Sequence, residues 1–363
     1  MKKQKKIILI GLVIFVILLI GIIIFNIIYS LLSKTTSNIA KDFKKLDFND
    51  EYLLIRTLSQ KSVSGTWIGW DLPGSGYALN LSSNKITKIN SIKGVAGHHI
   101  EILGKYDDYI YVYEDSKGTN KIKNGKSYNV LSYAKGKIFK NYMLYTLSEY
   151  NSNDGTSLNT TYLMNLDNGK TTKIYEYSSN NYNNEYGSAT DAIIIDNNLI
   201  AIQVLVGGGN KQVQLYDFNG TMTGYAAFDS RSILTSYNNE YILITDWIDD
   251  EYFASCYEVK TQKRTRVTKQ EYFQLLYNID NKVTVNNRPL IDIIGNPGER
   301  DDDLYFLILD SSEKIFFKSQ DYLRLFSVDK KTGQKIELFN ADKYNEKIDD
   351  AYIIWKYILI VLA

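Results

Sequence analysis

Short runs of alternating apolar and polar residues fill most of this chain, and tight polar turns separate them. Alternation with a period of two is typical of half-buried β-strands, and Asn-Gly between two such runs favours a β-hairpin. Tight polar turns recur six times, three of them with Asn-Gly, and are centred on residues 84–85, 124–126, 168–170, 219–221, 261–263 and 332–335. The pattern therefore predicts an all-β chain built from repeated hairpins.

The spacing of these turns indicates the architecture. Measured between their last residues, successive turns lie 41, 44, 51, 42 and 72 residues apart. Most of these steps are close to the period of about 40–50 residues that β-propeller blades show. We predict a β-propeller with seven blades, with six and eight blades as the alternatives.

One segment shows a complete four-stranded blade, whereas another is incomplete. The strands predicted for the complete blade are Thr190–Asp196, Leu199–Val206, Gln212–Phe218 and Thr223–Phe228. The 72-residue step leaves residues 272–294 over. We interpret these residues as a degraded blade with strands Phe273–Ile279, Lys282–Asn286 and Leu290–Ile294.

The two ends of the repeat region are expected to share the closing blade. Residues 76–89 supply one hairpin, and Ala351–Leu362 supplies two further strands. Residues 51–70 pack against this blade or form one of its strands. Closure by N- and C-terminal strands would hide sheet edges that could otherwise pair with another chain.

The N-terminus carries a long apolar run. Residues 7–32 are interrupted only by Asn26, Tyr29 and Ser30, and the basic segment 1–6 precedes them. About 20 helical residues span the core of a bilayer, whereas the apolar core of a signal peptide has about 7–15 residues. The run of 26 residues therefore predicts one uncleaved transmembrane helix, with a cleaved signal peptide as the alternative.

The basic flank of this helix predicts its orientation. Positively charged residues favour the cytoplasmic side of a membrane. We therefore expect a cytoplasmic basic tail at 1–6, a single-pass anchor in the cell membrane at 7–32, a juxtamembrane spacer at 33–50 and an extracytoplasmic propeller at 51–363. The membrane is thus one predicted partner of the chain.

Charge and cysteine content exclude two classes of function. Residues 1–34 hold five lysines and no acid, and the rest of the chain holds 37 basic and 41 acidic residues. Nucleic-acid binding needs a basic face, so we expect no nucleic-acid partner. The single cysteine, Cys256, allows no intrachain disulfide. It lies in a predicted strand with no basic neighbour to activate a thiolate, which favours a small buried residue over a nucleophile.

Two turns resemble those of a known superfamily. Residues 167–170 (Asp-Asn-Gly-Lys) and 329–333 (Asp-Lys-Lys-Thr-Gly) are similar to the Asp-x-x-Thr-Gly-Lys turn of bacterial quinoprotein-like and WD40-like propellers. In such a turn the Asp side chain caps backbone N–H groups, and Gly adopts a positive φ. The resemblance covers most of residues 51–363 and implies the fold. Glu337 and Tyr175 replace the docking Trp of quinoproteins, so we expect no cofactor.

Two loops combine aromatic and polar residues in a way that suits ligand binding. The Tyr177–Tyr186 crossover is rich in Tyr and Asn, and Asp246–Glu251 is acidic and contains a Trp. Loops of this kind line a propeller face, where ligands commonly bind. Compositional bias and an outer-rim loop are the alternative interpretations. The candidate binding residues are Tyr177, Tyr182, Tyr186, Asp246, Trp247 and Asp249.

Several polar segments could hold ions, but each lacks part of a site. Residues 98–99 are the only histidines, and alternation places one of them on a face with Glu101 without a third ligand. Residues 301–303 and 151–155 offer oxygen ligands, but the second has its Gly at the wrong position for an EF-hand. The glycines of 207–209 lack the Lys-Ser/Thr of a phosphate loop. We expect no metal site and no catalytic set.

Two functions remain. The first is a non-enzymatic binding or scaffold module, tethered to the membrane, for an extracytoplasmic protein or a cell-surface glycan. The alternative is a carbohydrate-active enzyme that uses a carboxylate pair from Asp246, Asp249, Asp301 and Asp303. Such a pair requires two carboxylates about 5–10 Å apart.

Overall fold

The computed structural model describes most of the chain beyond the N-terminal apolar run. The described residues are 40–47, 50–59, 73–89, 100–115, 117–153, 155–180, 187, 189–195, 198–207, 210–230, 233–237, 241–248, 251–295, 303–311 and 313–354. None of the helices formed by these residues is both long and apolar enough to span a bilayer. The anchor predicted at 7–32 lies outside them.

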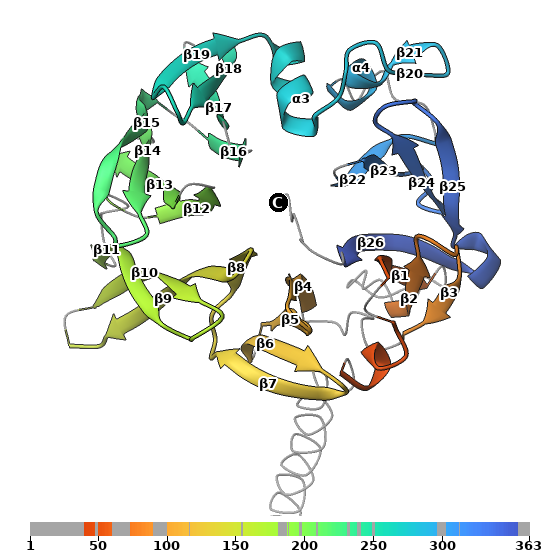
Figure 1. Cartoon of the computed structure of the whole chain (residues 1–363), viewed down its shortest axis with the longest axis horizontal. Coiled ribbons are helices and arrows are strands. Elements are labelled where there is room, and N and C mark those ends of the chain that lie inside the picture. Colours follow the sequence, from red (N-terminus) through yellow and green to blue (C-terminus); the bar gives the residue numbers. More distant parts are fainter. Residues whose placement is uncertain are drawn as a thin grey trace, which may run out of the picture.

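The described chain is mostly β-structure. It forms six four-stranded antiparallel sheets, which lie in a ring together with one helical segment (Figure 1). Strands β4 (Ile100–Tyr106), β12 (Ala189–Ile195) and β16 (Ile233–Tyr237) each form the edge of their sheet nearest the centre, and the opposite edge of each sheet lies at the rim. The arrangement is consistent with the predicted propeller.

The first three sheets come from the first half of the chain and from its C-terminal strand. Sheet 1 has the order β26-β1-β2-β3 and consists of β26 (Glu346–Ile354), β1 (Tyr52–Ser59), β2 (Pro73–Asn80) and β3 (Ile86–Lys88). Sheet 2 consists of β4 (Ile100–Tyr106), β5 (Tyr109–Glu114), β6 (Gly118–Lys123) and β7 (Lys126–Leu131). Sheet 3 consists of β8 (Gly136–Phe139), β9 (Tyr142–Asn151), β10 (Thr156–Asn165) and β11 (Thr171–Asn180).

The other three sheets each use one continuous segment. Sheet 4 consists of β12 (Ala189–Ile195), β13 (Leu199–Gly207), β14 (Asn210–Asp217) and β15 (Met222–Ser230). Sheet 5 consists of β16 (Ile233–Tyr237), β17 (Tyr241–Ile248), β18 (Glu251–Glu258) and β19 (Lys263–Val267). Sheet 6 consists of β22 (Phe306–Asp310), β23 (Lys314–Lys318), β24 (Arg324–Asp329) and β25 (Lys335–Asn340).

The six predicted turns are confirmed, and each joins the third and fourth strands of one sheet. Asn124 and Gly125 both have positive φ, 51° and 76°, as a type I′ turn between twisted strands requires. Asp329 Oδ1 accepts hydrogen bonds from the backbone N–H groups of Lys331 (2.9 Å) and Thr332 (2.8 Å). The Asp side chain thus caps its turn as predicted.

The two ends of the described chain meet in sheet 1. Strand β1 pairs with β26 from Tyr52↔Ile354 to Ser59↔Glu346. Closure by N- and C-terminal strands is therefore confirmed for these residues. The C-terminal segment contributes one described strand, β26, and β1 takes the second position of the sheet.

The strands predicted for residues 272–294 are wrong in part. Residues 269–295 form α3 (Lys269–Tyr277), a two-residue hairpin of β20 (Thr284–Val285) and β21 (Arg288–Pro289), and α4 (Leu290–Gly295). Helix α3 begins with a capping box in which Thr268 and Glu271 bond to each other's backbone N–H. Short apolar runs do not distinguish a buried strand from a buried helix by periodicity, which explains the error.

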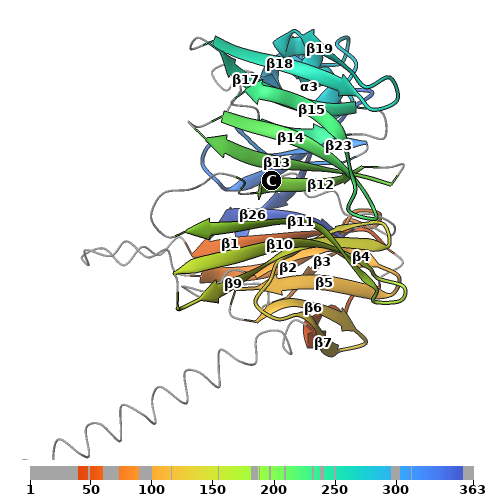
Figure 2. The ribbon, with the colours of Figure 1, turned by 90° about the vertical axis from the view of Figure 1, so that its left-hand side faces the viewer.

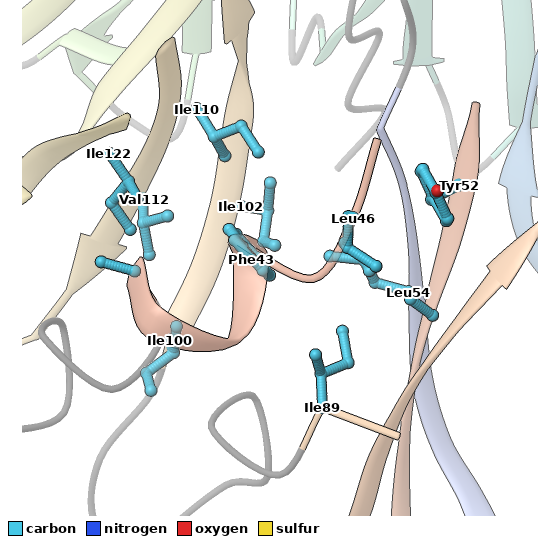
Figure 3. Close-up of a cluster of buried hydrophobic side chains, with 12 residues drawn as sticks. Phe43, Leu46, Tyr52, Leu54, Ile89, Ile100, Ile102, Ile110, Val112 and Ile122 are labelled. Atoms are coloured by element: carbon cyan, nitrogen blue, oxygen red, sulfur yellow. The ribbon is translucent and has the colours of Figure 1, made fainter. Parts of the chain in front are cut away.

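A short segment of the predicted spacer packs between sheets 1 and 2. Residues 40–43 are helical, and Phe43 and Leu46 are buried in one apolar cluster with Leu54, Ile102 and other side chains of both sheets (Figure 3). Phe43 has no exposed surface. The end of this segment is therefore part of the folded domain's core.

Candidate functional site

The connections between strands divide between two faces of the ring. Because each sheet is antiparallel, its first-to-second and third-to-fourth connections lie at one end, and its second-to-third connection lies at the other. Short links from one sheet to the next, such as 132–135 and 341–345, share that second end. We call it the loop face and the opposite one the turn face. Figure 2 shows the ring from the side, with strands running between the faces.

The topology places three of the six candidate binding residues near the loop face. Tyr177 lies three residues before the end of β11, and Asp246 and Trp247 lie close to the end of β17. Whether they bind a ligand stays a prediction. Outside the described residues are Tyr182, Tyr186 and Asp249.

The prediction of an acidic-aromatic loop over residues 246–251 is wrong in its extent. Strand β17 continues to Ile248, which pairs with Glu251 at the start of β18. Only residues 249–250 are left between the strands. Aromatic and β-branched residues on both sides of the turn favour strands, and this preference outweighs the cluster of acids.

Tyr177 has neighbours that hold it in place. It is half-buried, and burial raises its pKa. Its ring centre lies 6.2 Å from that of Tyr175, whose hydroxyl donates a 2.7 Å hydrogen bond to the carbonyl of Gly187. The crossover loop predicted at Tyr177–Tyr186 is therefore wrong at its start, because Tyr177 lies within β11, which pairs with β10 as far as Asn180.

The loop face carries exposed tyrosines that the sequence did not single out. The exposed fractions are 81% for Tyr133, 62% for Tyr150, 43% for Tyr344 and 38% for Tyr322. They lie on or beside connections of the loop face in sheets 1, 2, 3 and 6. By contrast, three exposed aliphatic side chains lie at the turn face, at the first or second residue of a fourth strand. They are Ile86, Met222 and Ile336.

Two of these tyrosines have left-handed backbone. Tyr133 has φ 59° and Tyr322 has φ 63°, whereas most of the other non-glycine residues with positive φ in the described chain are asparagines. Bulky side chains are rare in this region, and such strain persists only where the surrounding structure imposes it. No sequence pattern predicts a left-handed tyrosine, so both were missed.

The loop that holds Tyr133 is fixed by two neighbours on β6. A methyl group added to Gly118 would lie 2.1 Å from the carbonyl oxygen of Leu131 and 2.4 Å from the nitrogen of Tyr133. Only glycine lets the two backbones come this close. The buried Thr119 hydroxyl donates to the carbonyl of Ala134 (2.8 Å). The aromatic ring thus stands on a rigid base.

The loop that holds Tyr322 is fixed by polar contacts. Tyr322 N–H donates to the carbonyl of Ser319 (3.0 Å), and Leu323 N–H donates to Asp321 Oδ1 (3.0 Å). Burial alone would raise the pKa of Asp321, but the hydrogen bonds from Ser319 and Leu323 outweigh it and lower the pKa. The charged carboxylate therefore stabilises the turn at neutral pH.

Tyr344 belongs to an aromatic stack at the junction of sheets 6 and 1. Its ring is stacked on Phe339 at 5.7 Å between ring centres, with an angle of 11°, and its centre lies 4.9 Å from that of Tyr77. The Tyr77 hydroxyl donates a 2.8 Å hydrogen bond to Glu346. The exposed ring is thus supported by the sheet that closes the ring of strands.

Other candidate residues have structural roles. Cys256 is buried in β18, and burial, followed by the charge of Glu258, raises its pKa to about 11. The interpretation as a buried strand residue is confirmed. Asn151 accepts backbone hydrogen bonds from Gly155 and, through its side chain, from Asn153. Residues 151–153 and 155 therefore lie where β9 turns into β10.

Two carboxylates considered for ion binding or catalysis are paired with cations. Asp303 contacts Arg324 (3.0 Å) and Lys335 (2.8 Å), and Glu101 contacts Lys135 (2.6 Å). Within the described part of the chain, no three His, Cys, Asp or Glu residues are grouped to hold a metal ion. The histidines at 98–99 and the acids at 301–302 lie outside that part.

The chain is similar to several solved structures at low sequence identity. No family model matches the chain, and no curated protein matches its sequence. The chain is similar to a solved nidogen/laminin complex, with 10% identity over 85% of this chain and 99% of that one and a TM-score of 0.39. It is also similar to TolB from Acinetobacter baumannii, with 11% identity over 85% of this chain and 67% of that one and a TM-score of 0.38. A puromycin-hydrolysing peptidase from Mycobacterium tuberculosis is similar with 7% identity over 84% of this chain and 55% of that one, and a TM-score of 0.46.

These similar structures are β-propeller-like proteins. At such low identities the likeness concerns the fold alone. The ring of antiparallel sheets itself makes the described chain a mostly β fold that is consistent with a propeller.

Proposed function

We propose that this protein is a membrane-tethered, extracytoplasmic binding module whose loop face contacts a protein or a cell-surface glycan. Residues 7–32 form the tether in this proposal. The propeller has seven positions, and residues 269–295 take the place of a blade between sheets 5 and 6. The apolar N-terminal run and the helical segment that interrupts the ring support these two points.

The left-handed tyrosines of the loop face carry the proposal. A tyrosine ring offers apolar area and a hydroxyl at a small cost in conformational entropy, and Tyr is enriched at interfaces. Tyr133 and Tyr322 are held by the backbone contacts of Gly118 and by the Ser319–Asp321 turn. Rings that are already fixed lose little freedom on binding, which favours affinity.

The experiment compares two double variants of the full-length chain in intact cells by photo-crosslinking. Tyr133→Asn with Tyr322→Asn removes both rings and keeps residues that tolerate left-handed backbone. The matched control, Tyr128→Thr with Tyr225→Thr, removes two other exposed tyrosines (45% and 41%) from outer strands β7 and β15.

We expect the wild type and the control to crosslink to the same extracytoplasmic protein or glycan, and the loop-face variant to lose it. If the loop-face variant retains the partner in full, or the wild type enriches none, the proposal is wrong. Accessibility of an epitope after residue 363 to protease added outside the cell separately tests the orientation.

A further inference from the structure

The surfaces of sheets 3 and 4 that face each other change in character toward the loop face. The two sheets are neighbours in the ring (Figure 1), and their aliphatic side chains form one buried cluster that includes Leu144 and Ile202. Strand β9 runs from the turn face to the loop face, so residues on the same side of β9 beyond Leu144 lie progressively nearer the loop face. They are Thr146, Ser148 and Tyr150, and all three are exposed.

Strand register continues this polar surface across sheet 3. Ser148 pairs with Asn159 of β10, and Asn159 pairs with Tyr177 of β11. Directly paired residues of antiparallel strands share a side of their sheet. Ser148, Asn159 and Tyr177 therefore form a row across the three strands, and Tyr150 lies next to this row toward the loop face.

Sheet 4 adds two amide side chains to the same surface. Gln212 and Gln214 of β14 pair with Val204 and Ile202, which belong to the buried cluster shared with sheet 3. The Tyr216 hydroxyl donates to Gln214 Oε1 (2.7 Å), and Gln214 Nε2 donates to Gln212 Oε1 (3.2 Å). These hydrogen bonds orient Gln212, the member of the three that lies nearest the loop face.

Hydrogen bonds also orient the side chains of sheet 3. The Ser148 hydroxyl donates to Asn159 Oδ1 (2.5 Å), and Asn159 Nδ2 donates to the carbonyl of Ser157 (3.3 Å). Asn159 is buried, whereas Ser148 and Tyr150 are exposed. A buried amide thus positions an exposed hydroxyl beside an exposed ring. We call six side chains of the two sheets the uncharged patch: Ser148, Tyr150, Asn159, Tyr177, Gln212 and Gln214.

The opposite side of sheet 3 has a different chemistry. There Glu149 pairs with Leu158, and Glu176 lies on the same side of β11. All three residues are exposed. Tyr and Asn are abundant in the whole chain, but composition does not explain why acids and aliphatic groups lie on one side of these strands and aromatic, hydroxyl and amide groups on the other. A binding role accounts for this separation.

We propose that the uncharged patch binds a neutral glycan. The inference rests on the proposed function and deepens it, because it names a glycan as the loop-face partner. The rings of Tyr150 and Tyr177 offer faces against which the C–H groups of a sugar ring can pack. Amides and hydroxyls both donate and accept hydrogen bonds, as sugar hydroxyls do.

The charge and the width of the patch define the ligand further. None of the six side chains is charged, whereas an anionic glycan would favour Arg or Lys in its site. Ser148 and Tyr177 lie two strands apart, which is roughly 10 Å at the usual strand spacing. The patch would therefore contact more than one ring of a glycan chain.

The test probes an array of neutral and anionic oligosaccharides with the full-length chain, in a detergent without a sugar headgroup. The neutral probes are oligomers of glucose, mannose, galactose and N-acetylglucosamine. The patch variant, Tyr150→Ser with Gln212→Ala, removes one ring and one amide from different sheets. The matched control, Glu149→Gln with Leu158→Thr, changes two exposed residues on the opposite side of the same hairpin.

We expect the wild type and the control to bind at least one neutral oligosaccharide, with an affinity that changes little with salt because no ion pair is involved. The patch variant should bind about tenfold more weakly or worse, since it loses a packed ring and an amide hydrogen bond. Thermal unfolding followed by circular dichroism shows whether each protein is folded. Tyr150→Ser alone, at an exposed position, replaces the double variant if that one unfolds.

Three results would overturn the inference: no neutral oligosaccharide bound, a preference for anionic glycans, or equal losses in the patch variant and the control. A protein captured by crosslinking in cells, without any glycan bound on the array, would also overturn it but leave the proposed binding module standing. Glycan binding on the array without any partner captured in cells would instead support the patch and contradict the proposed function.

Discussion

The hydroxyl of Thr57 donates a 2.6 Å hydrogen bond to the carboxylate of Glu346, although 289 residues separate the two in sequence. The hydroxyls of Ser75 and Tyr77 also donate to this carboxylate, each over 2.8 Å. One side chain of β26 therefore ties together β1 and β2. These contacts add side-chain hydrogen bonds to the strand pairing that closes sheet 1.

We predict that Glu346→Ala lowers the free energy of unfolding by about 1–3 kcal/mol, because the Ser75 and Tyr77 hydroxyls lose this acceptor and Thr57 keeps only the carbonyl of Ser75. Denaturant titration of the full-length chain in detergent, followed by circular dichroism, measures this loss. The control Glu337→Ala removes an exposed acid of β25 and should change stability by less than about 0.5 kcal/mol. Equal effects of the two variants would contradict the closing role.

Buried tyrosines predict a loss of stability at alkaline pH. Burial raises the pKa of Tyr111 and Tyr216 to about 12. When the pKa of a phenol is higher in the folded than in the unfolded state, its contribution to the free energy of unfolding is complete at pH values below the unfolded pKa of about 10. Its contribution is then lost as pH rises from about 10 toward 12. The free energy of unfolding should therefore fall over this window.

Unfolding titrations at several pH values between 8 and 11.5, about the range of phenol ionisation, measure the decline. Tyr111→Phe should make it less steep, because one buried phenol no longer resists ionisation. Tyr128→Phe, which removes an exposed hydroxyl, should follow the wild-type curve. A decline that is identical in all three proteins would refute the assignment to Tyr111.

The left-handed tyrosines predict that binding and stability can be separated. Tyr133→Gly should raise stability, or leave it unchanged, because a left-handed backbone costs about 1–2 kcal/mol for a side chain with a Cβ. The same variant should weaken partner capture. Gly118→Ala should instead destabilise the fold, because its new methyl group meets the carbonyl of Leu131. Parallel denaturation and crosslinking assays give both readouts.

The burial of Phe43 predicts that the segment before β1 is part of the folded domain. Phe43→Ala should lower the free energy of unfolding by about 3–5 kcal/mol through the cavity left between sheets 1 and 2. It should also expose residues 40–47 to limited proteolysis. Lys44→Ala, at an exposed position beside it, should do neither. Unchanged protease resistance in Phe43→Ala would show that the segment is held by other contacts.

The parts of the fold that the sequence predicted depend on local chemistry. An Asn-Gly pair with positive φ, or an Asp that caps its own turn, specifies a hairpin without help from distant residues. Residues 269–295 depart from the predicted strands because the same apolar run can be buried as a strand or a helix. The Thr268–Glu271 capping box is the local signal that favours a helix at this point.

The candidate site was harder to predict because it depends on tertiary contacts. Tyrosine is abundant throughout the chain, so composition does not distinguish Tyr133 from Tyr111. One is exposed on a left-handed turn and the other is buried in sheet 2. The contacts of Gly118 and Thr119 impose this difference, and they arise only once the sheets have formed.

The pairing of β1 with β26 also sets an order of assembly. Sheets 2 to 6 each come from one continuous segment and can form as the chain emerges from the ribosome. Sheet 1 must wait for Glu346–Ile354, which are made after all the other described strands. The apolar cluster around Phe43 includes the first described residues to be made, but it therefore gains its complete support only after β26 has been made. Long-range pairing of this kind slows folding, so chains interrupted before residue 346 should be targets for proteolysis.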